Sequence, residues 1–168
     1  MIVDFHTHIW RFKGATPAQA RRVSSPEALL EAMDRAKVDK AVIVPLAYVS
    51  YASPRPIILD NDFILESVRN YPDRLIGFVE VNPRSDGAVE TVRHYLSEGL
   101  SGLKLLPNTH GYLMSNHALL DPLLEVCAGF RVPVFVRAND DITNTPLQIE
   151  EMARTFPQIP AFVIGQMG

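Results

Sequence analysis

Two histidines near the start of the chain have the spacing of a metal-binding pair. His6 and His8 lie in the apolar run IVDFHTHI, residues 2–9. In a β-strand, residues i and i+2 project to the same side, so both imidazoles would face one way and could share one ion. Asp4 projects the same way, and we expect it to orient one of the two rings. The alternative is that both histidines have ordinary hydrogen-bond partners and hold no metal; the paired spacing favours the metal.

Further polar side chains stand where later apolar runs end. They are Glu80, Asn82, Lys104, Arg137, Asn139 and Gln166. In barrels of alternating strands and helices, chemistry is concentrated at the carboxyl ends of the strands. These positions are therefore the candidates for a site that the first strand opens.

The elements that would position these residues alternate along the chain. Continuous apolar runs predict strands buried on both faces, as in a parallel sheet. The runs are residues 2–9, 40–47, 75–83, 102–107, 132–139 and 161–168. Five helical patterns lie between these runs. Three of them begin at Ser25–Pro26, Asp121–Pro122 and Thr145–Pro146, one stops before Pro72, and one ends near Gly99.

Six strands alternating with five helices predict an α/β fold. A doubly wound open sheet that binds nucleotides usually has a glycine-rich turn after its first strand, and this chain has His-Thr-His-Ile-Trp there. The polar strand ends favour a (β/α)8 barrel instead. Eight such units need about 200 residues or more, so we expect a single barrel-type domain over residues 1–168 that is truncated after its sixth strand.

Composition limits the kinds of partner. The chain has 168 residues, a net charge of −3 and no basic run, which argues against nucleic-acid and membrane partners. The lone Cys127 follows a helical apolar pattern and is expected to be a buried thiol. We expect a cytoplasmic protein that acts on a small molecule.

Three motifs together resemble the amidohydrolase superfamily, in its amidohydrolase-related branch. They are DFHTH at residues 4–8, GLKLLPNTHGY at 102–112 followed by DPLLEVCAGFRVPVFV at 121–136, and AFVIGQMG at 161–168. The resemblance covers the whole chain in order. It implies a (β/α)8 barrel and a divalent metal, usually zinc or manganese, that activates a water against an amide, ester or lactone. Some relatives decarboxylate instead, and some lactonases of this kind use no metal.

The chain departs from the family pattern at the remaining ligand positions. The fifth-strand histidine is replaced by Arg137, whose guanidinium has no lone pair for a metal. The sixth-strand histidine is replaced by Gln166, a weak ligand at best, and the eighth-strand aspartate is not in the sequence. Of the usual ligands only His6 and His8 are retained, whereas a catalytic zinc normally has three protein ligands.

Arg137 suggests another role for this position. A fixed positive charge at a barrel mouth can anchor a carboxylate or phosphate, and can replace part of the metal's charge. We therefore predict Arg137, Asn139 and Gln166 as substrate-binding residues, with Lys104 and Arg137 as candidates for catalysis.

Other polar residues have two interpretations each. Lys104 resembles the bridging lysine of binuclear relatives, but we favour a rim lysine or one paired with Glu80. His110 and His117 could complete a metal site, but are expected to be solvated loop histidines. Asp140 and Asp141 could ligate the metal or neutralise Arg137. The stretch at residues 48–60 is expected to be a long loop. It either controls access of substrate to the site or is a surface loop with no role in binding.

A barrel that stops at its sixth strand would leave open sheet edges. We therefore expect association with another copy of the chain or with a complementing chain. Three functions are carried forward. The first is a metal-dependent hydrolase of C–N or C–O bonds in a small anionic molecule, using His6 and His8. The second is a catalytically inactive relative that binds an anion or a partner. The third is an interaction protein.

Overall fold

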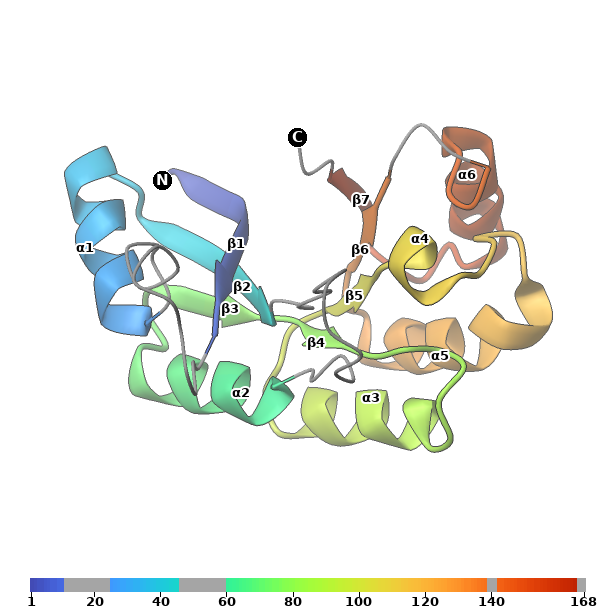
Figure 1. Ribbon diagram of the computed structural model, residues 1–168, viewed down its shortest axis with the longest axis horizontal. Coiled ribbons are helices and arrows are strands. Elements are labelled where there is room, and N and C mark those ends of the chain that lie inside the picture. The colour runs from blue at the N-terminus through green and yellow to red at the C-terminus, as the bar shows by residue number, and fades with distance from the viewer. Residues whose placement is uncertain (11–24, 46–59, 139–141, 166–168) are drawn as a thin grey trace, which may run out of the picture. The chain divides into compact units, whose positions relative to one another are not determined.

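The computed structural model describes residues 1–10, 25–45, 60–138 and 142–165. Strands and helices alternate along the chain, and all paired strands are parallel. The strands form two sheets with the orders β1-β2-β3 and β4-β5-β6-β7. The chain divides into two compact units, residues 1–78 and 79–168, each built on one of these sheets (Figure 1).

The first unit is a three-stranded sheet with two helices. Its elements are β1 (Val3–Ile9), α1 (Pro26–Ala36), β2 (Lys40–Pro45), α2 (Asn61–Asn70) and β3 (Leu75–Gly77). The apolar run of β2 is fully buried from Ala41 to Val44, as expected for a central parallel strand. Helix α1 begins where predicted, because the Ser25 side chain accepts a hydrogen bond from the Ala28 N–H and Pro26 occupies the first turn.

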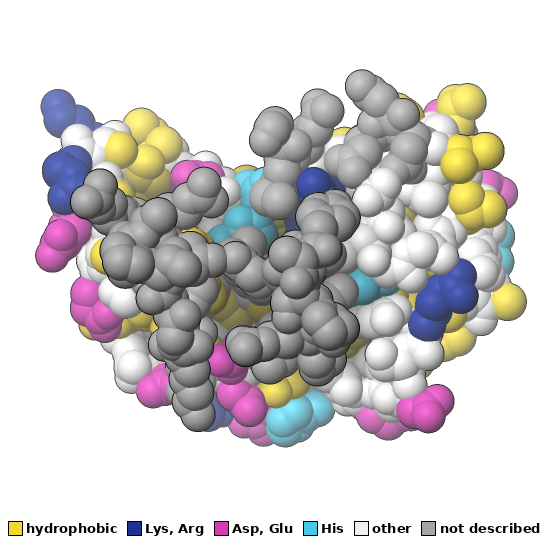
Figure 2. All heavy atoms as spheres, in the orientation of Figure 1, with side chains coloured by type: hydrophobic (Ala, Val, Ile, Leu, Met, Phe, Trp, Pro, Cys, Tyr) yellow, Lys and Arg dark blue, Asp and Glu magenta, His cyan; other side chains and the backbone are white. Residues whose placement is uncertain are grey.

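The second unit is a four-stranded sheet with its own helices. Its elements are β4 (Val79–Glu80), α3 (Ala88–Ser97), β5 (Leu103–Leu105), α4 (Pro107–His110), α5 (His117–Phe130), β6 (Val134–Arg137), α6 (Pro146–Thr155) and β7 (Phe162–Gly165). Helix α6 starts at the predicted Thr145–Pro146 and has a capping box between Thr145 and Gln148. Apolar side chains are exposed over α6 (Figure 2), where Leu147 is 76% exposed.

The predicted elements are confirmed with two corrections. The run at 75–83 is not one strand, because it breaks at Phe78 into β3 and β4, which pair in different sheets. The predicted start of the fourth helix at Asp121–Pro122 is wrong. Asn116 caps the Leu119 N–H and starts α5 at His117, so that Pro122 lies inside the helix rather than at its first position.

Strand neighbours follow sequence order, and a helix lies between most consecutive strands. This is the strand arrangement of a (β/α)8 barrel, so the predicted α/β fold class is confirmed. The prediction that residues 1–168 form a single domain stays a prediction. None of the helices within the described ranges is long and apolar enough to cross a membrane.

Candidate functional site

The imidazoles of His6 and His8 converge, as the strand geometry predicted. Their Nε2 atoms lie 3.1 Å apart and their ring centroids 4.9 Å apart. Two nitrogens bound to one tetrahedral zinc at 2.0–2.1 Å would be separated by roughly 3.3 Å. The observed spacing is therefore close to that of two ligands on one ion.

The hydrogen bond from His8 to β2 decides which of its nitrogens is available. His8 Nδ1 lies 3.1 Å from the carbonyl oxygen of Pro45. A carbonyl can only accept, so Nδ1 carries the hydrogen and Nε2 carries the lone pair. In this arrangement His6 Nε2–H donates to His8 Nε2, and a metal between them would displace that proton.

Asp4 and Thr7 fix the backbone between the two rings. Asp4 Oδ1 accepts a hydrogen bond from the backbone N–H of His6 at 3.1 Å, and the role of Asp4 in orienting a ring stays a prediction. Thr7 projects to the opposite side, and its hydroxyl donates to the Val42 carbonyl at 2.9 Å. The pairing of β1 with β2 shifts register between Asp4 and Thr7, so these two bonds hold an irregular stretch.

The histidine pair fits a metal as a partial ligand set. Within the described ranges, no cluster of three or more His, Cys, Asp or Glu side chains could hold an ion. Two imidazoles supply two of the three protein ligands that a catalytic zinc site normally has. His6 and His8 would hold the ion, and the remaining ligand would have to come from elsewhere.

The second unit contains a separate buried cluster of charged side chains. Glu80 on β4 and Lys104 on β5 are register partners, and both are 0% exposed. Lys104 pairs in turn with Phe135 on β6, and its Nζ lies 3.3 Å from the centroid of that ring. The expectation of a rim lysine is therefore wrong. The alternative of a lysine paired with Glu80 stays a prediction, because the two residues are strand neighbours but Lys104 Nζ makes no hydrogen bond within the described ranges.

Burial shifts the protonation of both partners. Burial raises the pKa of Glu80 to about 8, against the opposing pull of the positive charges of Lys104 and Arg137. Burial also lowers the pKa of Lys104 to about 7, with the Glu80 carboxylate opposing and Arg137 reinforcing the shift. The pair therefore combines an acid and an amine whose pKa values both lie near neutral pH.

Arg137 is the last residue of β6 and is half-buried. It lies two residues beyond Phe135, so its side chain is on the same face of the sheet as Lys104. Its Nε is buried and makes no hydrogen bond to the described residues. Arg137 therefore keeps a hydrogen-bond donor for a ligand. The other predicted substrate-binding residues, Asn139 and Gln166, lie outside the described residues, as do Asp140, Asp141 and most of the loop at 48–60.

The two further histidines are not simple loop residues. His110 ends α4 and is 8% exposed; burial lowers its pKa, and neither ring nitrogen has a hydrogen-bond partner in the described ranges. His117 is the first residue of α5, where its Nδ1 lies 2.9 Å from Asp121 Oδ1. His117 therefore forms an ion pair with Asp121 on the surface of α5 when its ring is protonated.

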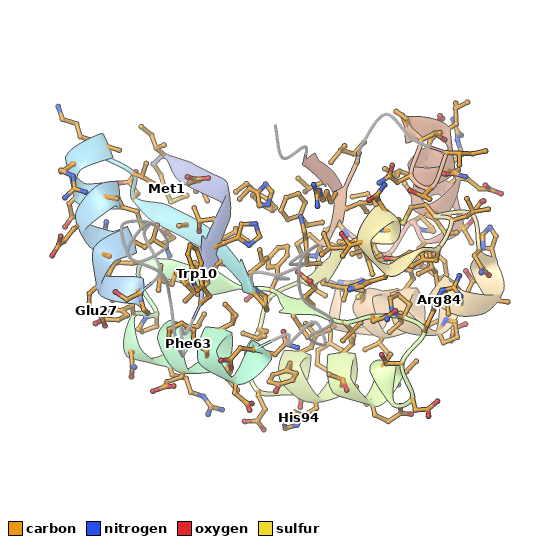
Figure 3. The ribbon with its side chains drawn as sticks, viewed as in Figure 1. Met1, Trp10, Glu27, Phe63, Arg84 and His94 are labelled. Atoms are coloured by element: carbon orange, nitrogen blue, oxygen red, sulfur yellow. The ribbon has the colours of Figure 1, made fainter. Side chains whose placement is uncertain are left out.

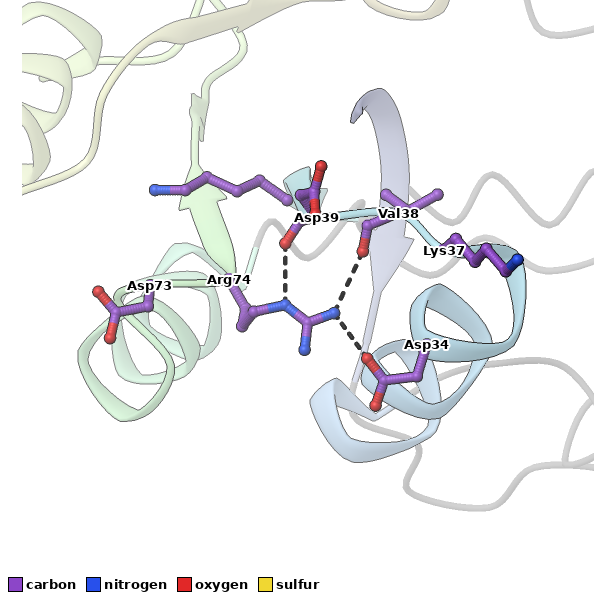
Figure 4. A pocket seen from close by; sticks show the side chains of 7 residues that line it. Asp34, Lys37, Val38, Asp39, Asp73 and Arg74 are labelled. Atoms are coloured by element: carbon purple, nitrogen blue, oxygen red, sulfur yellow. Dashed lines mark hydrogen bonds and ion pairs between the residues drawn. The ribbon is translucent and has the colours of Figure 1, made fainter. Parts of the chain in front are cut away.

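A shallow hollow of about 540 Å³ lies at the amino ends of β2 and β3. Arg74 crosses it and donates to the carbonyl oxygens of Val38 and Asp39 and to the Asp34 carboxylate (Figure 4). In barrels the amino ends of the strands serve stability rather than chemistry. We therefore assign this hollow to the framework of the first unit.

Sequence reasoning missed two contributors to the cluster in the second unit. Phe135 supplies the ring beneath Lys104, and the buried Tyr112 hydroxyl has its pKa raised by burial and by the Glu80 charge. Phe135 looked like an ordinary core residue of its strand. Tyr112 is the last residue of the motif GLKLLPNTHGY, and its place in that motif was the one sequence feature that could have pointed to it.

The chain belongs to the amidohydrolase family, whose pattern matches residues 3–168. No protein of curated function matches it. Solved structures that resemble it include a probable 2-pyrone-4,6-dicarboxylic acid hydrolase from Acinetobacter baumannii with citric acid bound, at 17% identity and a TM-score of 0.64, covering 97% of this chain and 57% of that one.

Two further similar structures differ in the reactions their names describe. A 4-oxalomesaconate hydratase from Rhodopseudomonas palustris has 16% identity and a TM-score of 0.65, covering 98% of this chain and 62% of its own. A 5-carboxyvanillate decarboxylase from Novosphingobium aromaticivorans with bound manganese has 16% identity and a TM-score of 0.62, covering 92% and 54%. This chain spans little more than half of their lengths, and at such identity the likeness shows the fold alone.

Proposed function

We propose that this protein is a metal-dependent hydrolase that acts on a C–N or C–O bond of a small anionic molecule. The observation that carries the proposal is the 3.1 Å separation of the His6 and His8 Nε2 atoms, with His8 Nδ1 held by the Pro45 carbonyl. Zinc or manganese would be held by these two imidazoles. When bound, such an ion lowers the pKa of a coordinated water and so provides a nucleophile at neutral pH.

Other residues of the chain hold the two imidazoles in position or contact the substrate. The Pro45 carbonyl keeps the proton of His8 on Nδ1, which leaves Nε2 for the metal. Thr7 and Asp4 hold the strand in the conformation that aims both rings the same way. Arg137, on β6 of the second unit, remains the proposed anchor for an anionic group, and Asn139 and Gln166 remain proposed substrate contacts.

Metal content tests the proposal most directly. The purified protein is loaded with zinc or manganese, freed of excess ion and measured by elemental mass spectrometry beside the His6→Ala/His8→Ala variant. His94→Ala is the matched control, since His94 lies exposed on the outer side of α3 (Figure 3). We expect about one equivalent in the parent and the control and a loss of 10-fold or more in the double variant.

Activity is then measured on small lactones, esters and N-acyl amides, each with and without a carboxylate. We expect turnover that a chelator abolishes and that zinc or manganese restores in the parent but not in the double variant. Metal binding without turnover of any of these substrates would contradict the proposal of a hydrolase.

A second candidate function is binding of an anion without turnover. It is favoured by Arg137, which stands where the family has a histidine and which retains a buried Nε without a hydrogen bond in the described ranges. Calorimetric titration with a dicarboxylate into the parent and into Arg137→Ala tests it. Equal affinity in the two proteins would rule out Arg137 as the anchor.

We also propose that the protein associates with a second copy or a complementing chain. β1 and β7 are outer strands of their respective sheets as the structure describes them, and Ile164 on β7 is 50% exposed. Sedimentation velocity over a range of concentrations measures this. A single species of monomer mass at all concentrations would contradict it.

A further inference from the structure

The buried cluster of the second unit brings an amine, an acid and a fixed cation to one face of the sheet. Glu80, Lys104 and Phe135 are register neighbours on β4, β5 and β6. Neighbouring residues of a parallel sheet project to the same side, and Arg137 projects there as well, one step nearer the strand end. The hydrolase proposed above uses the His6–His8 pair and leaves Lys104 and Glu80 without a role.

Lys104 is held in surroundings that are unusual for a lysine. Its side chain is 0% exposed, its Nζ sits 3.3 Å above the Phe135 ring, and that atom makes no hydrogen bond within the described ranges. A buried ammonium carries a charge and three N–H donors that need hydrogen-bond partners, whereas a neutral amine loses much less free energy when it is buried without them. The packing therefore tolerates the amine form, which is the nucleophilic form of lysine.

Glu80 is a proton carrier on the neighbouring strand. It faces Lys104 across one strand pairing and is equally buried, with a raised pKa that keeps a proton on the carboxyl group at neutral pH. A carboxylic acid beside an uncharged amine is the pair that imine formation requires, because the carbonyl oxygen has to leave as water. Arg137 is half-buried, whereas Lys104 and Glu80 are fully buried, so Arg137 is the charged group of this face that solvent reaches.

We propose that Lys104 is an amine nucleophile that forms an imine with a small 2-oxo acid or aldehyde acid, whose carboxylate pairs with Arg137. The lone pair of Nζ forms a C–N bond to the carbonyl carbon, and the carbonyl oxygen takes the proton of Glu80, so that nitrogen is left with two hydrogens and a positive charge. The Glu80 carboxylate removes one of these two protons, which gives a neutral carbinolamine. Glu80 then gives this proton to the hydroxyl group, which leaves as water as the C=N bond forms. The protonated imine remains on Lys104 beside the Glu80 carboxylate, which can take the last N–H proton.

The experiment traps this imine on the full-length protein. Glyoxylate and sodium cyanoborohydride are added at pH 7, and the reduced adduct is located by peptide mass spectrometry. The other lysines of the chain are Lys13, Lys37 and Lys40, and the exposed Lys37 is the internal standard. An ordinary exposed lysine is uncharged in only about one part in a thousand at pH 7, so we expect Lys104 to be labelled roughly tenfold faster or more.

Three single variants test the role of each residue of the cluster in forming the adduct. Lys104→Met replaces the amine with an uncharged side chain of similar length and should abolish only the Lys104 adduct. Glu80→Gln should slow the adduct, and Arg137→Ala should slow it with glyoxylate but not with propanal, which has no carboxylate. The propanal comparison separates loss of anion binding from loss of folding, which circular dichroism also monitors.

Labelling of Lys37 without labelling of Lys104 would overturn the proposal and leave the pair as a buried structural contact. Equal rates for glyoxylate and propanal in both the parent and Arg137→Ala would overturn the choice of substrate class. Because the adduct requires no metal, a failure here is distinct from a failure of the metal-dependent hydrolase proposed above.

Discussion

His8 and Pro45 form the hydrogen bond that decides how the first strand can bind a metal. The ring nitrogen Nδ1 of His8 lies 3.1 Å from the Pro45 carbonyl oxygen at the end of β2. This leaves Nε2 pointing at the Nε2 of His6, 3.1 Å away. The geometry that we propose for metal binding is therefore built by two neighbouring strands, and not by the His-x-His motif alone.

Replacing Thr7 by Val should weaken metal binding without touching either histidine. The Thr7 hydroxyl bonds the Val42 carbonyl at 2.9 Å, and its loss should cost about 1–2 kcal/mol of unfolding free energy and loosen the His6–His8 geometry. Denaturant unfolding and metal titration measure the two effects. Thr7→Ser keeps the hydroxyl and should restore both; metal affinity in Thr7→Val equal to that of the parent would show that this bond does not position the rings.

Glu80 should make stability fall as pH rises. Its pKa is raised from 4.5 to about 8 by burial, so between these values the folded protein keeps a proton that the unfolded chain releases. Unfolding free energy should therefore decline from about pH 5 to about pH 7 in the parent, and Glu80→Gln should lack this decline. Lys104 adds little in this window, because its pKa is lowered only to about 7. The same pH dependence in the parent and in Glu80→Gln would show that Glu80 is ionised in the folded protein over this range.

Gly165 should not accept a side chain. A Cβ at this position on β7 would collide with the Cε2 and Cζ atoms of the Phe135 ring, which is itself 1% exposed. Gly165→Ala should cost about 1–3 kcal/mol through overpacking, and should also disturb Lys104, which rests on the same ring. Urea unfolding measures the cost.

Gly129→Ala is the matched control for that substitution. Gly129 lies in α5 with no atom within 4 Å of an added Cβ, so alanine there should stabilise the protein by up to about 1 kcal/mol. Equal unfolding free energies for Gly165→Ala and the parent would mean that the Phe135 ring moves aside freely.

His117 should titrate above its ordinary value. Its pKa is raised from 6.5, mainly by the hydrogen bond to Asp121 and less by Glu151, whose Oε1 lies 3.5 Å from Nε2. Because the charged form is favoured in the folded state, the contribution is complete below the unfolded value and is lost as pH rises through the folded one. Imidazole resonances followed by NMR should show the raised value in the parent.

Asp121→Asn should bring the His117 titration back toward its ordinary range, while Glu151→Gln should have a smaller effect. An unchanged His117 titration in Asp121→Asn would contradict the assignment of the main cause. The His117 side chain is 37% exposed and the ion pair lies at the helix surface, so these substitutions are expected to change the overall stability little.

Much of the local structure followed from the sequence. Ser25–Pro26 and Thr145–Pro146 set helix starts because capping depends on residues within one turn. The start of α5 was missed because Asn116 caps it one turn and a half earlier than the Asp121–Pro122 signal, and the helix accommodates Pro122 internally. The break at Phe78 was also missed, because an apolar run does not reveal which strands it will pair with.

The sequence by itself determined the alternation of strands and helices, the family, and the common orientation of His6 and His8, since all of these depend on spacing along the chain. Only the tertiary structure decided that Lys104 is buried over Phe135 beside Glu80, and that Pro45 selects the nitrogen of His8. Those contacts join residues from separate strands. Burial and proton position are set by such neighbours, and no pattern within a single segment contains them.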